Sequence, residues 1–156
     1  MWRAEPIPAG PAVVFDVDGV LSDATHRQHF LEGPGMYWDS FFQACGEDPL
    51  IVETASMGQL LDASYRVVLL TARPIRVRPQ TLRWLGEHAD AVRWDLLIMR
   101  DEDDWGSSRS YKSGVLRDLL GLGFDVRLAL EDDPRNVEMF RKAGVPTIYI
   151  HSGYYE

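Results

Sequence analysis

Residues 13–23 read V-V-F-D-V-D-G-V-L-S-D, and this stretch predicts both the fold class and the position of a functional site. An apolar run ends in two carboxylates, Asp16 and Asp18, which are separated by one residue and followed by Gly19. Because side chains in a strand alternate with a period of two, both carboxylates start on the same side of the chain. Carboxylates this close repel each other unless a proton or a cation lies between them. The pair therefore indicates a divalent metal ion with chemistry beside it.

The rest of the chain alternates between apolar runs typical of buried strands and segments typical of helices. We expect strands at residues 12–15, 66–70, 94–99, 126–130 and 147–150. We expect helices at residues 36–44, 49–64, 74–88, 110–120 and 134–142. Strands separated by helices imply an α/β fold in which a parallel five-stranded sheet carries helices on both faces. In such sheets, ligands bind beyond the carboxyl ends of the strands.

Composition limits the class of protein. With 156 residues and 46% hydrophobic composition, the chain is long enough for one globular domain, residues 1–156. Its single cysteine, Cys45, excludes an internal disulfide framework and fits a reducing, cytoplasmic location. No segment resembles a signal peptide or reaches the length of a membrane span, so we expect no membrane partner. The net charge of −8 argues against a generally basic nucleic-acid binder but leaves a local basic site open.

Polar residues follow three of the expected strands. They are residues 16–19, 71–73 and 131–133, and Lys112 lies near the start of the helix before the fourth strand. At one sheet edge these groups supply a carboxylate nucleophile, a hydroxyl, a lysine and a second acidic cluster. Metal and lysine would neutralise phosphate charge while a carboxylate attacks phosphorus. The set predicts phosphoryl transfer.

The four motifs D-V-D-G-V, L-L-T-A-R, Lys112 and L-E-D-D, in this order, resemble those of the haloacid dehalogenase (HAD) superfamily of phosphatases. Residues 124–145, F-D-V-R-L-A-L-E-D-D-P-R-N-V-E-M-F-R-K-A-G-V, look like the corresponding stretch of the 3′-phosphatase domain of phage polynucleotide kinase. The resemblance implies a HAD-like Rossmannoid three-layer sandwich with a minimal cap or none. It also implies a Mg²⁺-dependent phosphatase that works through a phosphoaspartate.

The resemblance assigns roles to the motif residues. Asp16 would be the nucleophile, and Asp18 would protonate the leaving oxygen and then deprotonate the attacking water. Thr71 would hydrogen-bond a phosphate oxygen, and Lys112 would neutralise the phosphate and Asp16. Magnesium would be held by Asp16, the backbone carbonyl of Asp18, and Asp132.

Other positions are less determined. Arg27 and Arg73 fall where the phage domain carries arginines and could bind substrate phosphate. Glu131 departs from the residue usual at its position, so its role stays open. Asp133 precedes Pro134 and fits a helix N-cap as well as a metal site. The D-E-D-D run at residues 101–104 is expected to be a solvated loop.

The intervals between the motifs leave room only for a small lid within residues 22–48, built from residues 31–45, where Tyr37 or Trp38 could stack on a base. Such an open site suits a polymer end, such as the 3′-phosphate of DNA or RNA in nucleic-acid repair. No P-loop motif is present, so a kinase or ligase partner would be separate. Two alternatives stay open: a phosphatase for nucleotides or other small phosphoesters, and a non-enzymatic receiver-like module that holds phosphate on aspartate. The oligomeric state is not predicted.

Overall fold

The computed structural model describes residues 1–156 and is built on a five-stranded parallel sheet with the strand order β3-β2-β1-β4-β5. The strands are β1 (Pro11–Phe15), β2 (Arg66–Pro74), β3 (Leu96–Arg100), β4 (Asp125–Glu131) and β5 (Thr147–Tyr149). The chain builds outward from β1 to β3 on one side and then crosses back to place β4 on the other side. The strand order therefore reverses between β1 and β4, where open α/β sheets bind their ligands.

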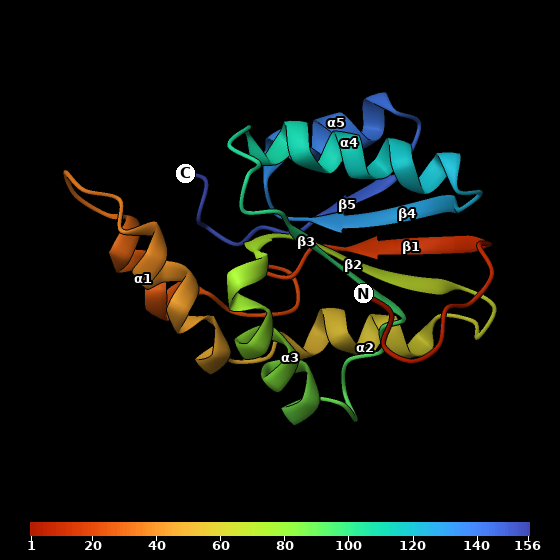
Figure 1. Cartoon of the computed structure of the whole chain (residues 1–156), viewed down its shortest axis with the longest axis horizontal. Coiled ribbons are helices and arrows are strands. Elements are labelled where there is room, and N and C mark those ends of the chain that lie inside the picture. The colour runs from red at the N-terminus through yellow and green to blue at the C-terminus, as the bar shows by residue number, and fades with distance from the viewer.

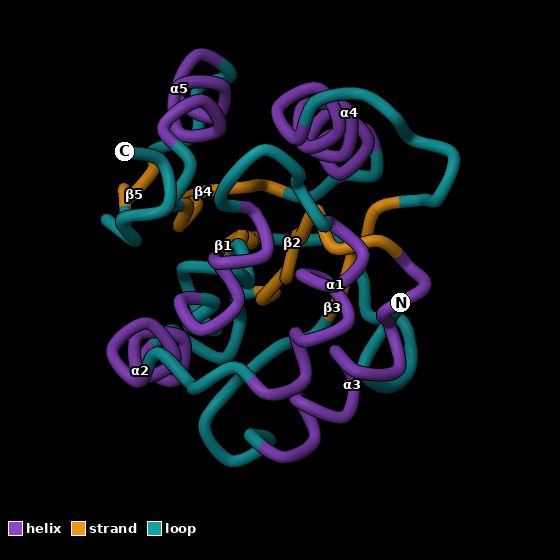
Figure 2. Tube along the Cα trace, turned by 90° about the vertical axis from the view of Figure 1, so that its left-hand side faces the viewer, coloured by secondary structure: helices purple, strands orange, loops and turns teal.

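Helices cover both faces of the sheet (Figures 1 and 2). The helices α4 (Ser108–Gly121) and α5 (Pro134–Lys142) lie on one face, and α2 (Val52–Leu60) and α3 (Arg78–Glu87) lie on the other. This arrangement confirms the expected three-layer α/β sandwich.

Strand alternation divides the core into two clusters. Val13 and Phe15 pack toward the face that carries Trp84 of α3, whereas Val14 packs with Leu116 of α4 on the opposite face. Because both faces of the strands are covered, their sequences are continuous apolar runs, as is usual in parallel sheets.

The prediction of a helix that starts at Pro74 is wrong. Pro74 is the last residue of β2, and a short 3₁₀ helix, η3 (Ile75–Val77), separates it from α3. The first turn of α3 contains Pro79, whose fixed φ and missing N–H suit that position equally well. The helix expected over residues 49–64 is also shorter, because it begins only at Val52 and ends at Leu60.

Between β1 and α2 the chain forms the 3₁₀ helix η1 (Thr25–Leu31), the short helix α1 (Trp38–Gln43) and the 3₁₀ helix η2 (Ala44–Glu47). This segment projects past the carboxyl edge of the sheet, at the left of Figure 1. It occupies the position expected for the lid, and we call residues 25–47 the lid segment. None of the helices has the length and hydropathy that a membrane span requires.

Candidate active site

Three carboxylates meet where the strand order reverses. Asp16 follows β1, Glu131 ends β4, and Asp132 comes next; each offers an oxygen, and these oxygens all lie within 4.8 Å of one another. The N–H of Asp16 donates to the carbonyl of Leu130 at 3.0 Å, which fixes the two strand ends side by side. All three acidic residues are buried. The topology thus brings the first and fourth motifs together, as the sequence predicts.

The Asp132 carboxylate has the environment of a cation ligand. Both of its oxygens are buried and have no hydrogen-bond partner. Burial, together with the charge of Glu131, raises the pKa of Asp132 to about 7. Gly19 makes this close approach possible: its φ is 78°, and a Cβ there would lie 2.7 Å from Cγ of Asp132. A buried, unpaired carboxylate needs a proton or a cation, and carboxylate oxygens suit Mg²⁺, so the residues present fit a divalent metal ion.

Lys112 lies inside the same cluster. Its Nζ is 3.0 Å from Oδ1 of Asp16 and 2.7 Å from Oε2 of Glu131. Burial disfavours the charged lysine, but the two carboxylates raise its pKa above the ordinary value. Burial and the charge of Glu131 likewise raise the pKa of Asp16, although Lys112 opposes them.

Glu131, whose role the sequence leaves open, orients this cluster. One of its oxygens accepts a hydrogen bond from Lys112, and the other accepts the backbone N–H groups of Asp132 and Asp133, both at 3.1 Å. The side chain therefore holds the lysine in place and also shapes the loop that carries Asp132.

Asp18 points to a different set of partners. Its Oδ1 accepts hydrogen bonds from Nη2 of Arg27 at 2.5 Å and from Nη2 of Arg73 at 2.6 Å. Burial alone would raise the pKa of Asp18, but the charges of the two arginines hold it well below its usual range. Asp18 is therefore ionised in this arrangement, and its predicted role as a proton donor requires a change in these pairs.

Asp48 is a site residue that the sequence does not reveal. Its fully buried carboxylate accepts from Nε of Arg27 at 2.8 Å, from Nη2 of Arg73 at 3.1 Å and from the Ser22 hydroxyl at 2.8 Å. Nε2 of His26 lies 2.8 Å from Oδ1 of Asp48, the oxygen that also accepts from Arg27 Nε. Asp48 lies in a polar stretch and precedes a proline, a pattern typical of a turn. No local sequence pattern links it to arginines more than twenty positions away. Arg27 and Arg73 are themselves buried, and their contact with substrate phosphate stays a prediction.

The remaining predicted residues lie around this centre. The Thr71 hydroxyl accepts a hydrogen bond from the backbone N–H of Arg73 at 3.1 Å and so shapes the end of β2. Its contact with phosphate stays a prediction. The Asp133 side chain accepts the N–H of Arg135 at 2.9 Å, which makes it the N-cap of α5. Tyr37 and Trp38 are exposed on the lid segment, as base stacking would require.

Comparison with known proteins agrees with this geometry. The sequence pattern of the family described as polynucleotide kinase PNKP phosphatase domain matches residues 10–155. Two similar solved chains come from a Pnkp1/Rnl/Hen1 complex and from a Pnkp1/Rnl/Hen1 RNA repair complex, with TM-scores of 0.73 and 0.71 and identities of 24% and 25%. A haloacid dehalogenase-like hydrolase from Streptococcus pneumoniae shares the fold, with a TM-score of 0.66 and 15% identity.

The extent of these matches differs. The alignments with the two Pnkp1 chains cover 96% of this chain but only 48% and 45% of those chains, so this chain spans about half their length. The alignment with the Streptococcus hydrolase covers 93% of this chain and 86% of that chain.

Proposed function

Since the chain belongs to the family of polynucleotide kinase PNKP phosphatase domains, and so to the HAD phosphatases, we propose that it removes the 3′-phosphate from a polynucleotide end with Mg²⁺ as its cofactor. The observation that supports this proposal is the buried cluster in which Asp16 lies beside Lys112 and near an unpaired Asp132. Family membership also decides against a non-enzymatic receiver-like module, and the strand order differs from the receiver arrangement, in which β1 and β3 flank the switch point.

The proposed reaction has two steps on one carboxylate. An oxygen of Asp16 attacks phosphorus, the bond between phosphorus and the sugar oxygen breaks, and a phosphoaspartate forms. Asp18 gives its proton to the leaving oxygen and later takes one from the water that attacks phosphorus, which releases inorganic phosphate and restores Asp16. Lys112 stabilises the charge on the transferring group. A magnesium ion held by Asp16, Asp132 and the backbone carbonyl of Asp18 would supply further electrostatic stabilisation.

The arginine pairs of Asp18 set a condition on the first step. Asp18 must carry a proton to act as an acid, whereas Arg27 and Arg73 hold it ionised. A substrate phosphate carries two negative charges and competes for the same guanidinium groups. We therefore include in the proposal that movement of the lid segment, which carries Arg27, lets the phosphate draw the arginines away from Asp18 and lets its pKa rise.

Within this chain only a short lid segment projects past the carboxyl edge of the sheet (Figure 1), which supports a polymer end as the substrate. The similar Pnkp1 chains come from assemblies with Rnl and Hen1, one of them described as an RNA repair complex. We propose that this chain also works beside a kinase or ligase activity in nucleic-acid repair.

The test is a panel of phosphate-release assays with Mg²⁺. The substrates are DNA and RNA oligonucleotides with a 3′-phosphate, 3′-mononucleotides, and p-nitrophenyl phosphate. We expect the oligonucleotides to have the highest kcat/KM and Asp16→Asn to release no phosphate from any substrate, whereas Asp90→Asn, at an exposed position, serves as the unaffected control. Preference for mononucleotides would favour the small-phosphoester alternative, and turnover by Asp16→Asn would contradict the phosphoaspartate mechanism.

A further inference from the structure

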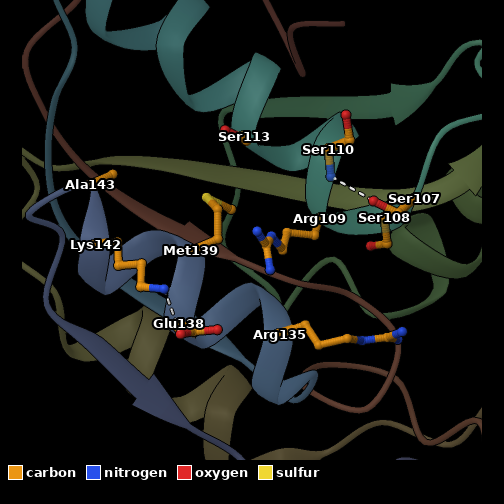
Figure 3. A pocket seen from close by; sticks show the side chains of 10 residues that line it. All are labelled: Ser107, Ser108, Arg109, Ser110, Ser113, Arg135, Glu138, Met139, Lys142 and Ala143. Atoms are coloured by element: carbon orange, nitrogen blue, oxygen red, sulfur yellow. Dashed lines mark hydrogen bonds and ion pairs between the residues drawn. The ribbon is translucent and has the colours of Figure 1, made fainter.

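A polar groove lies between α4 and α5, outside the acidic cluster, and no part of the proposed reaction uses it (Figure 3). Its volume is about 710 Å³, and only Met139 and Ala143 among its lining residues are hydrophobic. Arg109, Arg135 and Lys142 contribute three positive charges, against one negative charge from Glu138. A locally basic groove on a chain with a net charge of −8 calls for a specific explanation.

One of these basic side chains, Arg109, has no ion-pair partner, and the other two are paired with carboxylates. Arg109 makes no ion pair, and Figure 3 shows it pointing across the groove from α4 toward α5. Arg135 pairs with Asp133 through Nε and Nη2, which leaves Nη1 free. Lys142 is also paired, because its Nζ lies 2.7 Å from Glu138. Arg109 can therefore bind an anion without first breaking an ion pair.

The neutral lining also suits phosphate. Ser107, Ser108, Ser110 and Ser113 also line the groove; the Ser107 hydroxyl accepts the N–H of Ser110, and the Ser108 hydroxyl accepts from Asn136 (Figure 3). They surround the first turns of α4, a helix whose N-terminus carries the positive end of the helix dipole and no acidic residue. Serine hydroxyls, arginines and helix N-termini are the groups that contact the sugar–phosphate backbone in nucleic-acid complexes.

The groove and the active centre lie on the same two helices. Nδ2 of Asn136, in the first turn of α5, donates to the Ser108 hydroxyl at 3.2 Å, so the starts of the two helices touch. Lys112 lies one helical turn beyond Ser108, and its ammonium group reaches Asp16. On the other helix, Arg135 pairs with Asp133, the neighbour of Asp132.

We propose that this groove holds the phosphodiester backbone of the substrate strand, upstream of the 3′-phosphate that is removed. The inference rests on the proposed function and adds the path of the nucleic-acid strand. In this path the 3′ end lies at Asp16, and the preceding phosphates lie along α4 and α5. An acidic peptide would satisfy the same charges. The near absence of apolar lining, on which peptide side chains would pack, and the position beside the active centre favour a nucleic-acid strand.

Binding can be measured apart from turnover. Fluorescence anisotropy would follow labelled 3′-hydroxyl oligonucleotides of four and twelve nucleotides at several salt concentrations, with the full chain and Mg²⁺. We expect the longer strand to bind more tightly, and Arg109→Gln to weaken it roughly tenfold. The slope of log K against log salt should decrease in magnitude by about 0.7 for the lost phosphate contact. Arg127→Gln is the matched control, because Arg127 is exposed on β4, pairs with Asp125 and lies away from the groove.

Kinetics distinguish failure of this inference from failure of the proposed function. We expect the ratio of kcat/KM for a twelve-nucleotide 3′-phosphate to that for p-nitrophenyl phosphate to fall roughly tenfold in Arg109→Gln and to stay constant in Arg127→Gln. Hydrolysis of 3′-phosphates with no dependence on strand length and no effect of Arg109→Gln would overturn the groove alone. Binding of polyglutamate in preference to the oligonucleotide would also overturn it. No hydrolysis of 3′-phosphates at any length would overturn the proposed substrate.

Discussion

The carboxylate of Asp48 pairs with two guanidinium groups that have no access to solvent. Asp48→Asn would leave Arg27 and Arg73 with only Asp18 as an anionic partner. Because breaking a buried ion pair leaves an uncompensated charge, we expect the free energy of unfolding to fall by about 3 kcal/mol or more. Urea denaturation measures this change, with the exposed Asp90→Asn as the control near zero. A loss as small as that of the control would show that the network contributes little to stability.

Gly19 offers a second test at the scale of one residue. Gly19→Ala combines a strained φ with a collision between the new Cβ and the Asp132 carboxylate. The backbone strain alone is worth about 1–2 kcal/mol. Gly144→Ala is the matched control, since Gly144 has a φ of 85° and a Cβ there meets nothing within 4 Å.

Both glycine variants should lose stability in thermal unfolding, but only Gly19→Ala should also lose phosphatase activity. Equal activity in the two variants would mean that the position of Asp132 beside Gly19 is unimportant for turnover.

These residues also show which parts of the site can be predicted from the sequence. Asp16, Lys112 and Asp132 are predictable because each follows or precedes a recognisable strand, and parallel strands end at the same edge. The network of Asp48 is not predictable in this way. Its partners come from the lid segment and from the end of β2, and the fold of an irregular segment leaves no periodic pattern in the sequence.

At the scale of elements, α5 begins at the acidic loop and lines the groove that we propose for the nucleic-acid strand. Its N-cap is Asp133. Asp133→Ala removes the acceptor for the N–H of Arg135 and should lower the free energy of unfolding by about 1 kcal/mol. Asp133→Asn keeps a good N-cap and should restore most of that stability. If Asp133 acts only as a cap, phosphatase activity in Asp133→Asn stays near that of the unchanged protein. A loss of activity as large as in Asp133→Ala would instead assign the carboxylate charge a role in the site.

The elements themselves were predictable to different degrees. Continuous apolar runs identified all five strands, because both faces of a parallel sheet are buried. The sequence does not place the start of α3, because Pro74 and Pro79 are both acceptable at the end of a strand or the beginning of a helix. The lid segment is predictable only from the interval between motifs, and its two 3₁₀ helices have no sequence signature comparable to a hydrophobic period.

At the scale of the whole molecule, the acidic cluster joins the two halves of the sheet. Asp16 belongs to the half formed by β1, β2 and β3, and Glu131 and Asp132 belong to the half formed by β4 and β5. Repulsion among these carboxylates, offset in part by Lys112, therefore acts between the halves. A bound cation would remove that repulsion and would bind only the folded chain, since the ligands come from distant parts of the sequence.

Magnesium should therefore stabilise the entire fold. For a cation at a hundred times its dissociation constant, the stabilisation is about 2.7 kcal/mol. In a domain of this size, that corresponds to a rise in Tm of roughly 5–10 °C. Differential scanning calorimetry of the metal-free chain with increasing Mg²⁺ measures this shift.

Asp132→Asn is the decisive variant, because it removes the unpaired carboxylate and one of the repelling charges. We expect it to unfold at a higher temperature than the unchanged chain without metal and to show little further rise with Mg²⁺. A rise equal to that of the unchanged chain would place the cation elsewhere, for example at the acidic loop of residues 101–104.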